Sequence, residues 1–173
     1  MTPGKPAPTE PCLIDLPSQK MAVVRGRGVP DKVFPDMMPA LYGSVYTLKF
    51  ALKKQGLPTF KVSPPRARYP DILASDKASW TIVLGIPVPE DTSVLPQKVP
   101  GVTVALETWS YGPTAEILHV GGYDQETPSI ERLRAFIEAS GYEIAGDHEE
   151  EYLTRPDAKV MKTIIRYPVS KKG

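Results

Sequence analysis

The chain has 173 residues, 41% of them hydrophobic, which suffices for one domain or two small fused modules. Its 21 Lys and Arg nearly balance its 20 Asp and Glu, so the net charge of +1 predicts no attraction to nucleic acid or to anionic membranes. The single cysteine, Cys12, excludes an internal disulfide, and two histidines alone do not make a zinc site, so we expect no metal and no cofactor. No apolar run approaches the ~18 residues of a membrane span, and we expect a cytoplasmic protein.

The first half of the chain predicts two strands, a helix and two further strands after a proline-rich start at 1–11, which we expect to be disordered. The helix at 35–55 is the clearest element, because apolar residues recur there at intervals of three and four. They are Met38, Leu41, Val45, Leu48 and Leu52. Apolar runs predict strands at 12–16, 21–28, 59–62 and 80–88, while prolines predict a loop at 63–71.

The second half predicts a similar series of elements. A helix at 128–140 has Thr127 available as N-cap and Pro128 in its first turn. Strands are predicted on both sides of it, at 102–112, 115–123, 142–153 and 162–169.

The two halves also resemble each other in sequence. VRGRG at 24–28 and HVGGY at 119–123 each close a strand with glycine before a helix, and WTIVLGIPV and KTIIRYPV both end in Pro-Val. We therefore predict an α+β fold of two fused β-α-β-β modules, at about 12–100 and 101–170, within a single domain at 12–173. Such modules would form an antiparallel sheet with two helices on one face and a ligand cavity between the modules.

Two features of this pattern suggest a binding site. Tyr42, Tyr46 and Phe50 follow one another at intervals of four on the first helix, where they form either part of a broad buried face or the lining of a cavity. In HEEEYL at 148–153, strand alternation puts Glu150 on the opposite side from Glu149 and Glu151. We expect the two outer glutamates to be solvated charges on an edge strand, and Glu150 is either a third such charge or a site residue.

Several segments resemble the GyrI-like small-molecule-binding family, also called the bacterial effector-binding fold, and in particular its free-standing single-domain branch. The resemblance covers about residues 12–169. It is carried by VVRGRGVPD, ALYGSVYTLKFALKK, SWTIVLGIP, EILHVGGYDQETPSIERLRAFIEASGY and EEEYLTRPDAKVMKTIIRYPV. It implies a glutamate facing the ligand cavity two residues before a tyrosine of the penultimate strand, which here gives Glu150 and Tyr152.

The resemblance implies a protein that binds small aromatic or cationic organic molecules. The near-zero net charge and the lack of a long apolar run predict no nucleic-acid or membrane partner, and no protein partner is specified. It also implies two alternatives: a cofactor-free hydrolase of cyclopropane-type electrophiles with Glu150 and Tyr152 as catalytic residues, and a topoisomerase inhibitor. Whether the chain is an enzyme stays open, because Arg66 and Tyr69 replace a Glu and a Trp of similar proteins. The predicted ligand contacts are Glu150, Tyr152, Tyr42, Tyr46, Trp80, Tyr123 and His119.

Four residues near these candidates allow two interpretations each. His119, within an apolar strand, is more typical of a structural histidine than of a catalytic base. Trp109 either borders the cavity or packs in the core. Arg66 and Arg68 either guard the cavity mouth or are solvated.

Overall fold

The computed structural model describes residues 8–73 and 76–173, so part of the proline-rich start predicted to be disordered, residues 1–7, lies outside the described residues. Contacts between residues divide the chain into two compact units. The first unit comprises residues 18–110. The second unit comprises residues 111–173 together with the N-terminal residues up to Pro17.

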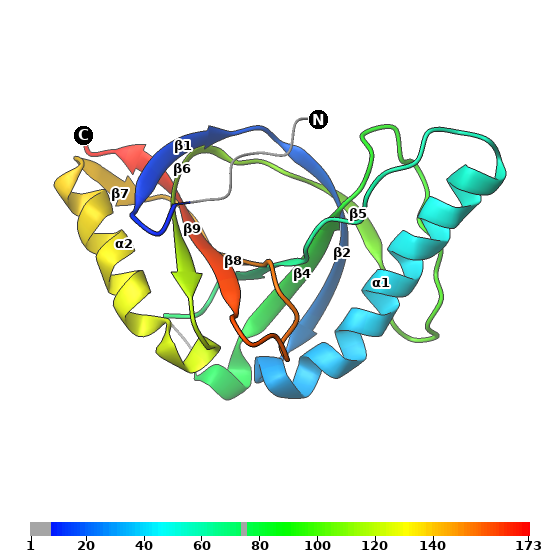
Figure 1. Ribbon diagram of the computed structural model, residues 1–173, viewed down its shortest axis with the longest axis horizontal. Helices are drawn as coiled ribbons and strands as arrows, with labels where there is room; N and C mark the ends of the chain where they lie inside the picture. Colours follow the sequence, from blue (N-terminus) through cyan, green and yellow to red (C-terminus); the bar gives the residue numbers. More distant parts are fainter. Residues whose placement is uncertain (1–7, 74–75) are drawn as a thin grey trace. The chain divides into compact units, whose positions relative to one another are not determined.

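The first unit is an antiparallel sheet with one long helix (Figure 1). Its strand order is β3-β4-β2-β5, and α1 packs against β2 and β4 through a buried stripe that includes Met37, Leu41 and Val45. Of the five residues in the predicted aliphatic stripe, Leu41 and Val45 are buried, while Met38, Leu48 and Leu52 are partly buried. The elements are β2 (Gln19–Arg27), α1 (Pro30–Lys54), β3 (Arg66–Tyr69), the 3-10 helix η1 (Lys77–Ser79), β4 (Thr81–Pro87) and β5 (Ala105–Trp109).

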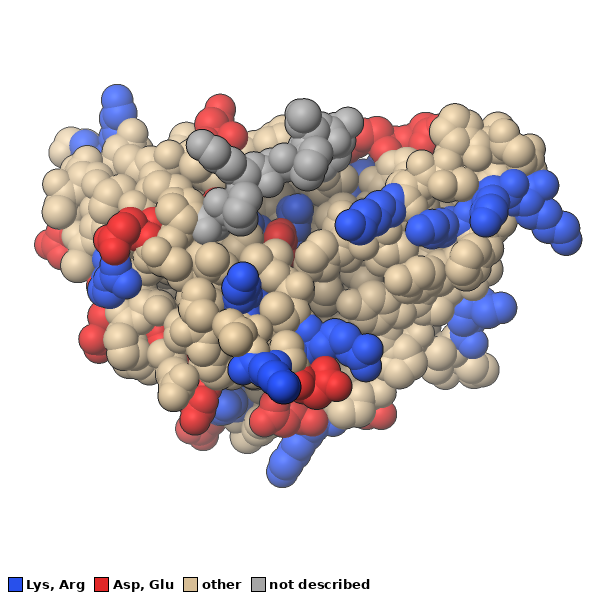
Figure 2. Space-filling view, viewed as in Figure 1, with Lys and Arg blue, Asp and Glu red and all other residues tan. Residues whose placement is uncertain are grey.

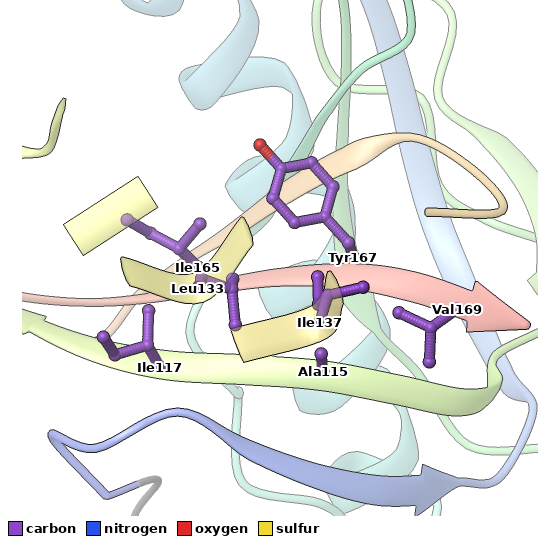
Figure 3. Close-up of a cluster of buried hydrophobic side chains, with 7 residues drawn as sticks. All are labelled: Ala115, Ile117, Leu133, Ile137, Ile165, Tyr167 and Val169. Atoms are coloured by element: carbon purple, nitrogen blue, oxygen red, sulfur yellow. The ribbon is translucent and has the colours of Figure 1, made fainter. Parts of the chain in front are cut away.

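The second unit repeats this arrangement with a shorter helix. Its strand order is β1-β6-β9-β8, all antiparallel, and β7 pairs with the end of β9. One face of β6 and β9 packs against Leu133 and Ile137 of α2 and forms the core of this unit (Figure 3). The elements are β1 (Cys12–Leu16), β6 (Gly112–Val120), the 3-10 helix η2 (Tyr123–Gln125), α2 (Thr127–Ala139), β7 (Tyr142–Ile144), β8 (His148–Tyr152) and β9 (Lys162–Lys171).

The predicted fold class is confirmed. Each unit also contains one backbone hydrogen bond at an equivalent position. Gly28 and Gly121, which follow β2 and β6, have φ angles of 130° and 137°, a region that favours glycine. The Gly28 amide donates to the Trp80 carbonyl just before β4, and the Gly121 amide donates to the Met161 carbonyl just before β9, both at 2.9 Å. Each unit therefore closes its β-α connection in the same way.

The prediction for residues 59–71 is wrong. Residues 59–62 form no strand, whereas Arg66–Tyr69, inside the predicted loop, form β3. The prolines misled the prediction, because Pro65 and Pro70 flank this strand and remove no donor from its ladder. Ala67 and Tyr69 alternate with the two arginines and are buried, as expected of a strand with one face on the core.

Both helix starts also differ from the prediction. Helix α1 begins at Pro30, five residues early, and contains Pro35 and Pro39. Both prolines lie on the exposed side, where water can bind the carbonyls left without an N–H donor. Thr127 does not cap α2: it is the first helical residue, and Glu126 precedes it without a side-chain cap bond.

Charges of both signs are interspersed over the face in Figure 2, as the net charge of +1 would suggest. Within residues 8–73 and 76–173, no helix combines the length and the hydropathy that a membrane crossing needs. The same residues contain no group of three or more His, Cys, Asp or Glu side chains that could hold a metal ion.

Candidate functional site

Strand β8 presents three polar or aromatic side chains to the helix-facing side of its unit. Glu150 lies opposite Ile165 of β9, which belongs to the core cluster under α2, so Glu150 shares that face. His148 and Tyr152 lie on the same face by alternation. All three are buried, with exposed fractions of 3% for His148, 7% for Glu150 and 9% for Tyr152.

His148 joins Glu150 to a tyrosine of the neighbouring strand. Its Nε2 lies 3.0 Å from Glu150 Oε2, and its Nδ1 lies 2.7 Å from the Tyr167 hydroxyl. Burial lowers the pKa of His148 to about 4, so the ring is neutral at neutral pH. The carboxylate can only accept, so Nε2–H donates to Glu150 and Nδ1 accepts from the Tyr167 O–H. In Figure 3 this hydroxyl points away from the aliphatic cluster.

A second buried carboxyl group, that of Glu126, interacts with Glu150. Glu126, at the junction of η2 and α2, is only 8% exposed. Burial, then the negative charge of Glu150 and a hydrogen bond between the two carboxyl groups, raise the pKa of Glu126 to about 9. A hydrogen bond between two carboxyl groups needs a proton on one of them, so Glu126 is protonated at neutral pH and donates to Glu150. Oε1 of Glu126 is fully buried, so the carboxyl group lies inside the unit and not at its surface.

Two of the predicted aromatic contacts lie together beside this strand. The Tyr123 and Tyr152 rings meet edge to face, with centroids 5.6 Å apart. Tyr123 is 39% exposed, so this aromatic pair extends from the buried strand to the protein surface.

His119 is also on the helix-facing side, and both of its ring nitrogens are hydrogen-bonded. Nε2 lies 3.0 Å from the Gly122 carbonyl, which can only accept, so Nε2–H donates to it, and Nδ1 lies 2.8 Å from the Ser129 hydroxyl, which can donate or accept. These bonds fasten the η2 turn to the start of α2 and fit a structural histidine. A contact of His119 with a ligand stays a prediction.

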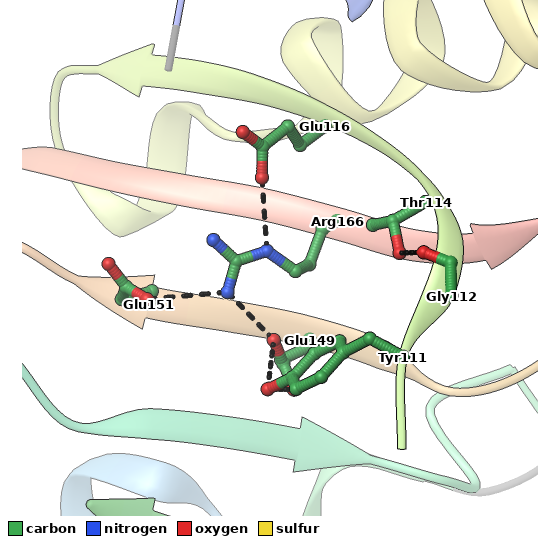
Figure 4. A network of polar contacts seen from close by, with 7 residues as sticks. All are labelled: Tyr111, Gly112, Thr114, Glu116, Glu149, Glu151 and Arg166. Carbon is green, nitrogen blue, oxygen red and sulfur yellow. Dashed lines mark hydrogen bonds and ion pairs between the residues drawn. The ribbon is translucent and has the colours of Figure 1, made fainter. Parts of the chain in front are cut away.

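The outer glutamates of HEEEYL are not solvated, and that expectation is wrong. Glu149 is 2% exposed and Glu151 is partly buried, because both lie beside Arg166 of β9 (Figure 4). Arg166 Nη1 is 2.9 Å from Glu149 Oε2 and 3.3 Å from Glu151 Oε1, while Nε is 3.2 Å from Glu116 Oε2. The Tyr111 hydroxyl donates to Glu149 at 2.9 Å.

Electrostatics keeps this arginine charged. Burial lowers the pKa of Arg166, but the charges of Glu151, Glu149 and Glu116 outweigh burial and raise the pKa overall. Glu149, Arg166 and Glu116 are direct cross-strand neighbours on β8, β9 and β6. The network therefore stabilises the sheet on the face opposite Glu150.

The predicted contacts of the first unit, Tyr42, Tyr46 and Trp80, each pack against another aromatic ring. Tyr42 and Tyr46 stack at 6.2 Å on α1, with Tyr42 half-buried and Tyr46 41% exposed, so the aromatic stripe is not part of a fully buried face. Trp80 meets Tyr69 edge to face at 5.7 Å. The role of Tyr42, Tyr46 and Trp80 in ligand binding stays a prediction.

Burial bears on the two interpretations given above for Trp109 and for Arg66 and Arg68 of β3. Trp109 is 3% exposed, and its ring lies against the Cα of Gly85, where an added Cβ would be 2.8 Å away. It therefore packs in the core. The Arg68 guanidinium lies 4.0 Å from the Trp109 ring centroid, and Arg66 is partly buried, so neither arginine is fully solvated.

Strand register identifies the residue of the first unit that corresponds to Glu150 of the second unit. Counted from the carbonyls that accept from Gly28 and Gly121, Leu84 of β4 corresponds to Ile165 of β9. Their cross-strand partners are Ala67 and Glu150, so alanine occupies the place of Glu150 in the first unit. Since the first unit folds in the same way around an alanine, the carboxyl group at 150 is not a requirement of the fold.

Sequence reasoning missed Glu126, Tyr167 and Arg134, which surround His148 and Glu150. Arg134 of α2 hydrogen-bonds Tyr167 and lies over its ring, 5.8 Å from the centroid. Alternation in β9 could have identified Tyr167, because it shares a face with Ile165. Glu126 gave no such signal, since at a helix start a glutamate is ordinarily explained by the helix dipole.

A separate pocket of about 500 Å³ lies within the first unit. None of the predicted ligand contacts lines it. Its walls come from β2, the start of α1 and the segment before β5, and they are Val23, Val24, Arg25, Gly26, Val33, Asp36, Met37, Gly101, Val102, Thr103 and Ala105.

Comparison with known proteins shows the fold but no family. No family model and no curated protein matches the chain. An uncharacterized conserved protein from Listeria innocua is 24% identical, with 95% of this chain and 94% of that one covered and a TM-score of 0.84. A hydrolase from Listeria innocua is 24% identical over 95% and 93% of the two chains, with a TM-score of 0.80. The C-terminal domain of EcmrR is 15% identical over 94% and 98%, with a TM-score of 0.69.

Proposed function

We propose that the protein is a member of the GyrI-like family and binds small aromatic or cationic organic molecules beside Glu150, on the helix-facing side of the second unit. The observation that carries the proposal is the buried Glu126–Glu150 carboxyl pair next to the Tyr123 and Tyr152 rings. A buried charge is costly and is rarely kept without a role. The alanine at the corresponding place in the first unit supports a function for Glu150 beyond folding.

The chemistry of these groups suits such ligands. The tyrosine rings offer dispersion contacts and cation–π attraction of about 0.5 to 2 kcal/mol each. Glu150 carries negative charge, and its hydrogen bonds to His148 and Glu126 hold the carboxylate in one orientation. A ligand cation would therefore meet a charge whose position is already fixed, which reduces the cost of ordering on binding.

Hydrolysis of a reactive electrophile at the same residues is a second candidate. It is favoured by one observation: a protonated carboxyl group, Glu126, is hydrogen-bonded to an ionised one, Glu150, so an acid and a base lie in contact. The Tyr152 hydroxyl would then assist at the leaving atom. Similar folds occur in a hydrolase from Listeria innocua and in the C-terminal domain of EcmrR, so the fold does not choose between the two candidates.

An NMR titration with a cationic aromatic dye tests the proposed site. We expect the largest amide shifts at residues 122–127 and 148–152, around the two carboxyl groups. The pocket of the first unit serves as the internal control. Shifts confined to residues 23–26 and 101–105 would place the ligand there instead and contradict the proposal.

A further inference from the structure

The pocket of the first unit lies along the edge of a strand. It is lined by four consecutive residues of β2, 23–26, together with the start of α1 and the segment before β5. Successive side chains of a strand point to opposite faces, so a pocket over one face would contact only every second residue. Contact with four residues in a row therefore places this pocket at the backbone edge of β2. The pocket belongs to the other unit from Glu150, so it is a separate site.

This edge is open because β5 pairs with only part of β2. The ladder between them ends where Val23 lies opposite Ala105, whereas β2 continues to Arg27. Just before Ala105 the chain turns at Gly101, whose φ is 80°, and residues 102–104 belong to no strand. The pocket lies between this segment and the second half of β2.

The backbone groups of Arg25 point into this opening. The Lys20 carbonyl accepts from the Val88 N–H at one end of β4, and the Gly28 N–H donates to the Trp80 carbonyl at the other end. Since backbone groups alternate between the two edges of a strand, the even-numbered residues of β2 face β4 and the odd-numbered ones face away from it. Among the described residues, none bonds the N–H or C=O of Arg25 on that open side. Arg25 thus offers one donor and one acceptor side by side.

The side chains around the opening favour a neutral, aliphatic ligand. Two hydrogen bonds hold the Arg25 guanidinium on Glu107 of β5, so its charge is already matched by a carboxylate. Asp36 of α1 lines the pocket and is exposed, so its negative charge disfavours an acid. The apolar part of the lining contains no aromatic ring and consists of Val23, Val24, Val33, Met37, Val102 and Ala105.

We propose that this pocket is a second binding site, which takes neutral molecules with an aliphatic body and a primary carboxamide or a lactam. In these groups an N–H and the C=O lie on the same side, so the ligand C=O accepts from the Arg25 N–H while the ligand N–H donates to the Arg25 C=O. A volume of about 500 Å³ suits a small molecule. An extended peptide fits less well, because only Arg25 and Arg27 turn backbone groups outward beyond the end of the ladder, fewer than strand addition uses.

NMR titrations with three probes of nearly the same shape test this site. They are adamantane-1-carboxamide, 1-adamantyl methyl ketone, which has no N–H, and adamantane-1-carboxylate, which is charged. We expect the carboxamide to shift the amide signals of residues 23–26 and 101–105, with the largest shift at Arg25, whose N–H gains an acceptor. The ketone should bind about three- to tenfold more weakly, because it cannot donate to the Arg25 C=O. The carboxylate should bind more weakly than the ketone, because Asp36 repels it.

A pocket-filling variant gives a second test. Val102→Phe puts a larger side chain into the pocket wall and should weaken carboxamide binding at least about tenfold. Val94→Phe is the matched control, since Val94 is 75% exposed and lies outside the pocket, and this variant should bind like the wild type.

Several results would overturn the proposal. They are carboxamide shifts that are absent from residues 23–26, equal affinities for the carboxamide and the ketone, a carboxylate that binds most tightly, and unchanged binding by Val102→Phe. An Arg25 signal that depends on protein concentration before any probe is added would show that a second copy of the chain occupies the edge, which also overturns it. The three probes need only the wild type, so they decide the matter even if Val102→Phe fails to fold. None of these results bears on the site beside Glu150.

Discussion

Two buried groups whose pKa values are shifted, Glu126 and His148, give the protein a predictable dependence of stability on pH. Glu126 has a pKa of about 9 in the folded state against its ordinary 4.5, so the unfolded chain loses a proton that the folded protein keeps, and stability decreases as pH rises from 4.5 to 9. His148 has a pKa of about 4 against 6.5, so the unfolded chain gains a proton that the folded protein does not, and stability decreases as pH falls from 6.5 to 4.

These two effects have opposite slopes, each of about 1.4 kcal/mol per pH unit. Between pH 4.5 and 6.5 they cancel, and the contribution of the pair to the free energy of unfolding is constant. Above pH 6.5 only Glu126 titrates, so about 3 kcal/mol is lost by pH 9. That loss is a large share of the 5 to 15 kcal/mol by which proteins are typically stable.

Urea denaturation of the wild type and of Glu126→Gln at half-unit intervals from pH 5 to 9 measures this effect. The variant keeps the shape of the side chain but cannot ionise, so its stability should stay level above pH 6.5 while that of the wild type declines. The difference between the two curves removes the titration of groups that Glu126 does not influence, including Cys12, whose pKa burial also raises. Parallel curves for the two proteins would show that Glu126 does not hold its proton in the folded state.

Two further predictions concern the sheet and the repeat. Arg166→Met removes the cation that contacts three carboxylates and should cost about 3 to 5 kcal/mol in urea denaturation, whereas the exposed Arg155→Met should stay within about 0.5 kcal/mol of wild type; equal effects would refute the network. Gly28→Ala and Gly121→Ala should each cost more than about 1 kcal/mol, because both positions have positive φ, and a shift in thermal midpoint for only one of them would contradict the shared connection.

The sequence was most informative where a pattern reflects the local chain. Periodicity located both helices, and the matched glycines of VRGRG and HVGGY predicted the equivalent connections that Gly28 and Gly121 form. It was least informative where burial depends on partners distant in the chain. Glu149 is buried because Arg166 and Glu116 lie beside it on β9 and β6, and this alignment follows only from the strand register.

At the candidate site, too, the sequence could not reveal contacts between residues that are distant in the chain. Alternation correctly separated Glu150 from its neighbours, but it could not tell which side of β8 faces α2, and both sides proved to be buried. Glu126 escaped notice because its partner, Glu150, is 24 residues away in the sequence and meets it only in the folded chain. Arg166, in contrast, had a visible signal: it is the single charged residue of TIIRYPV at 163–169.

The most direct test of the proposed site is the affinity of a cationic aromatic dye for Glu150→Gln, measured by fluorescence titration beside the wild type. Glu138→Gln on the exposed side of α2 is the matched control, because Glu149 and Glu151 contact Arg166 and cannot serve. Glu150→Gln should weaken binding by roughly 1.5 to 3 kcal/mol, as the loss of a charged contact does, while Glu138→Gln should stay within about 0.5 kcal/mol of wild type. Equal affinities for all three proteins would contradict the proposed site.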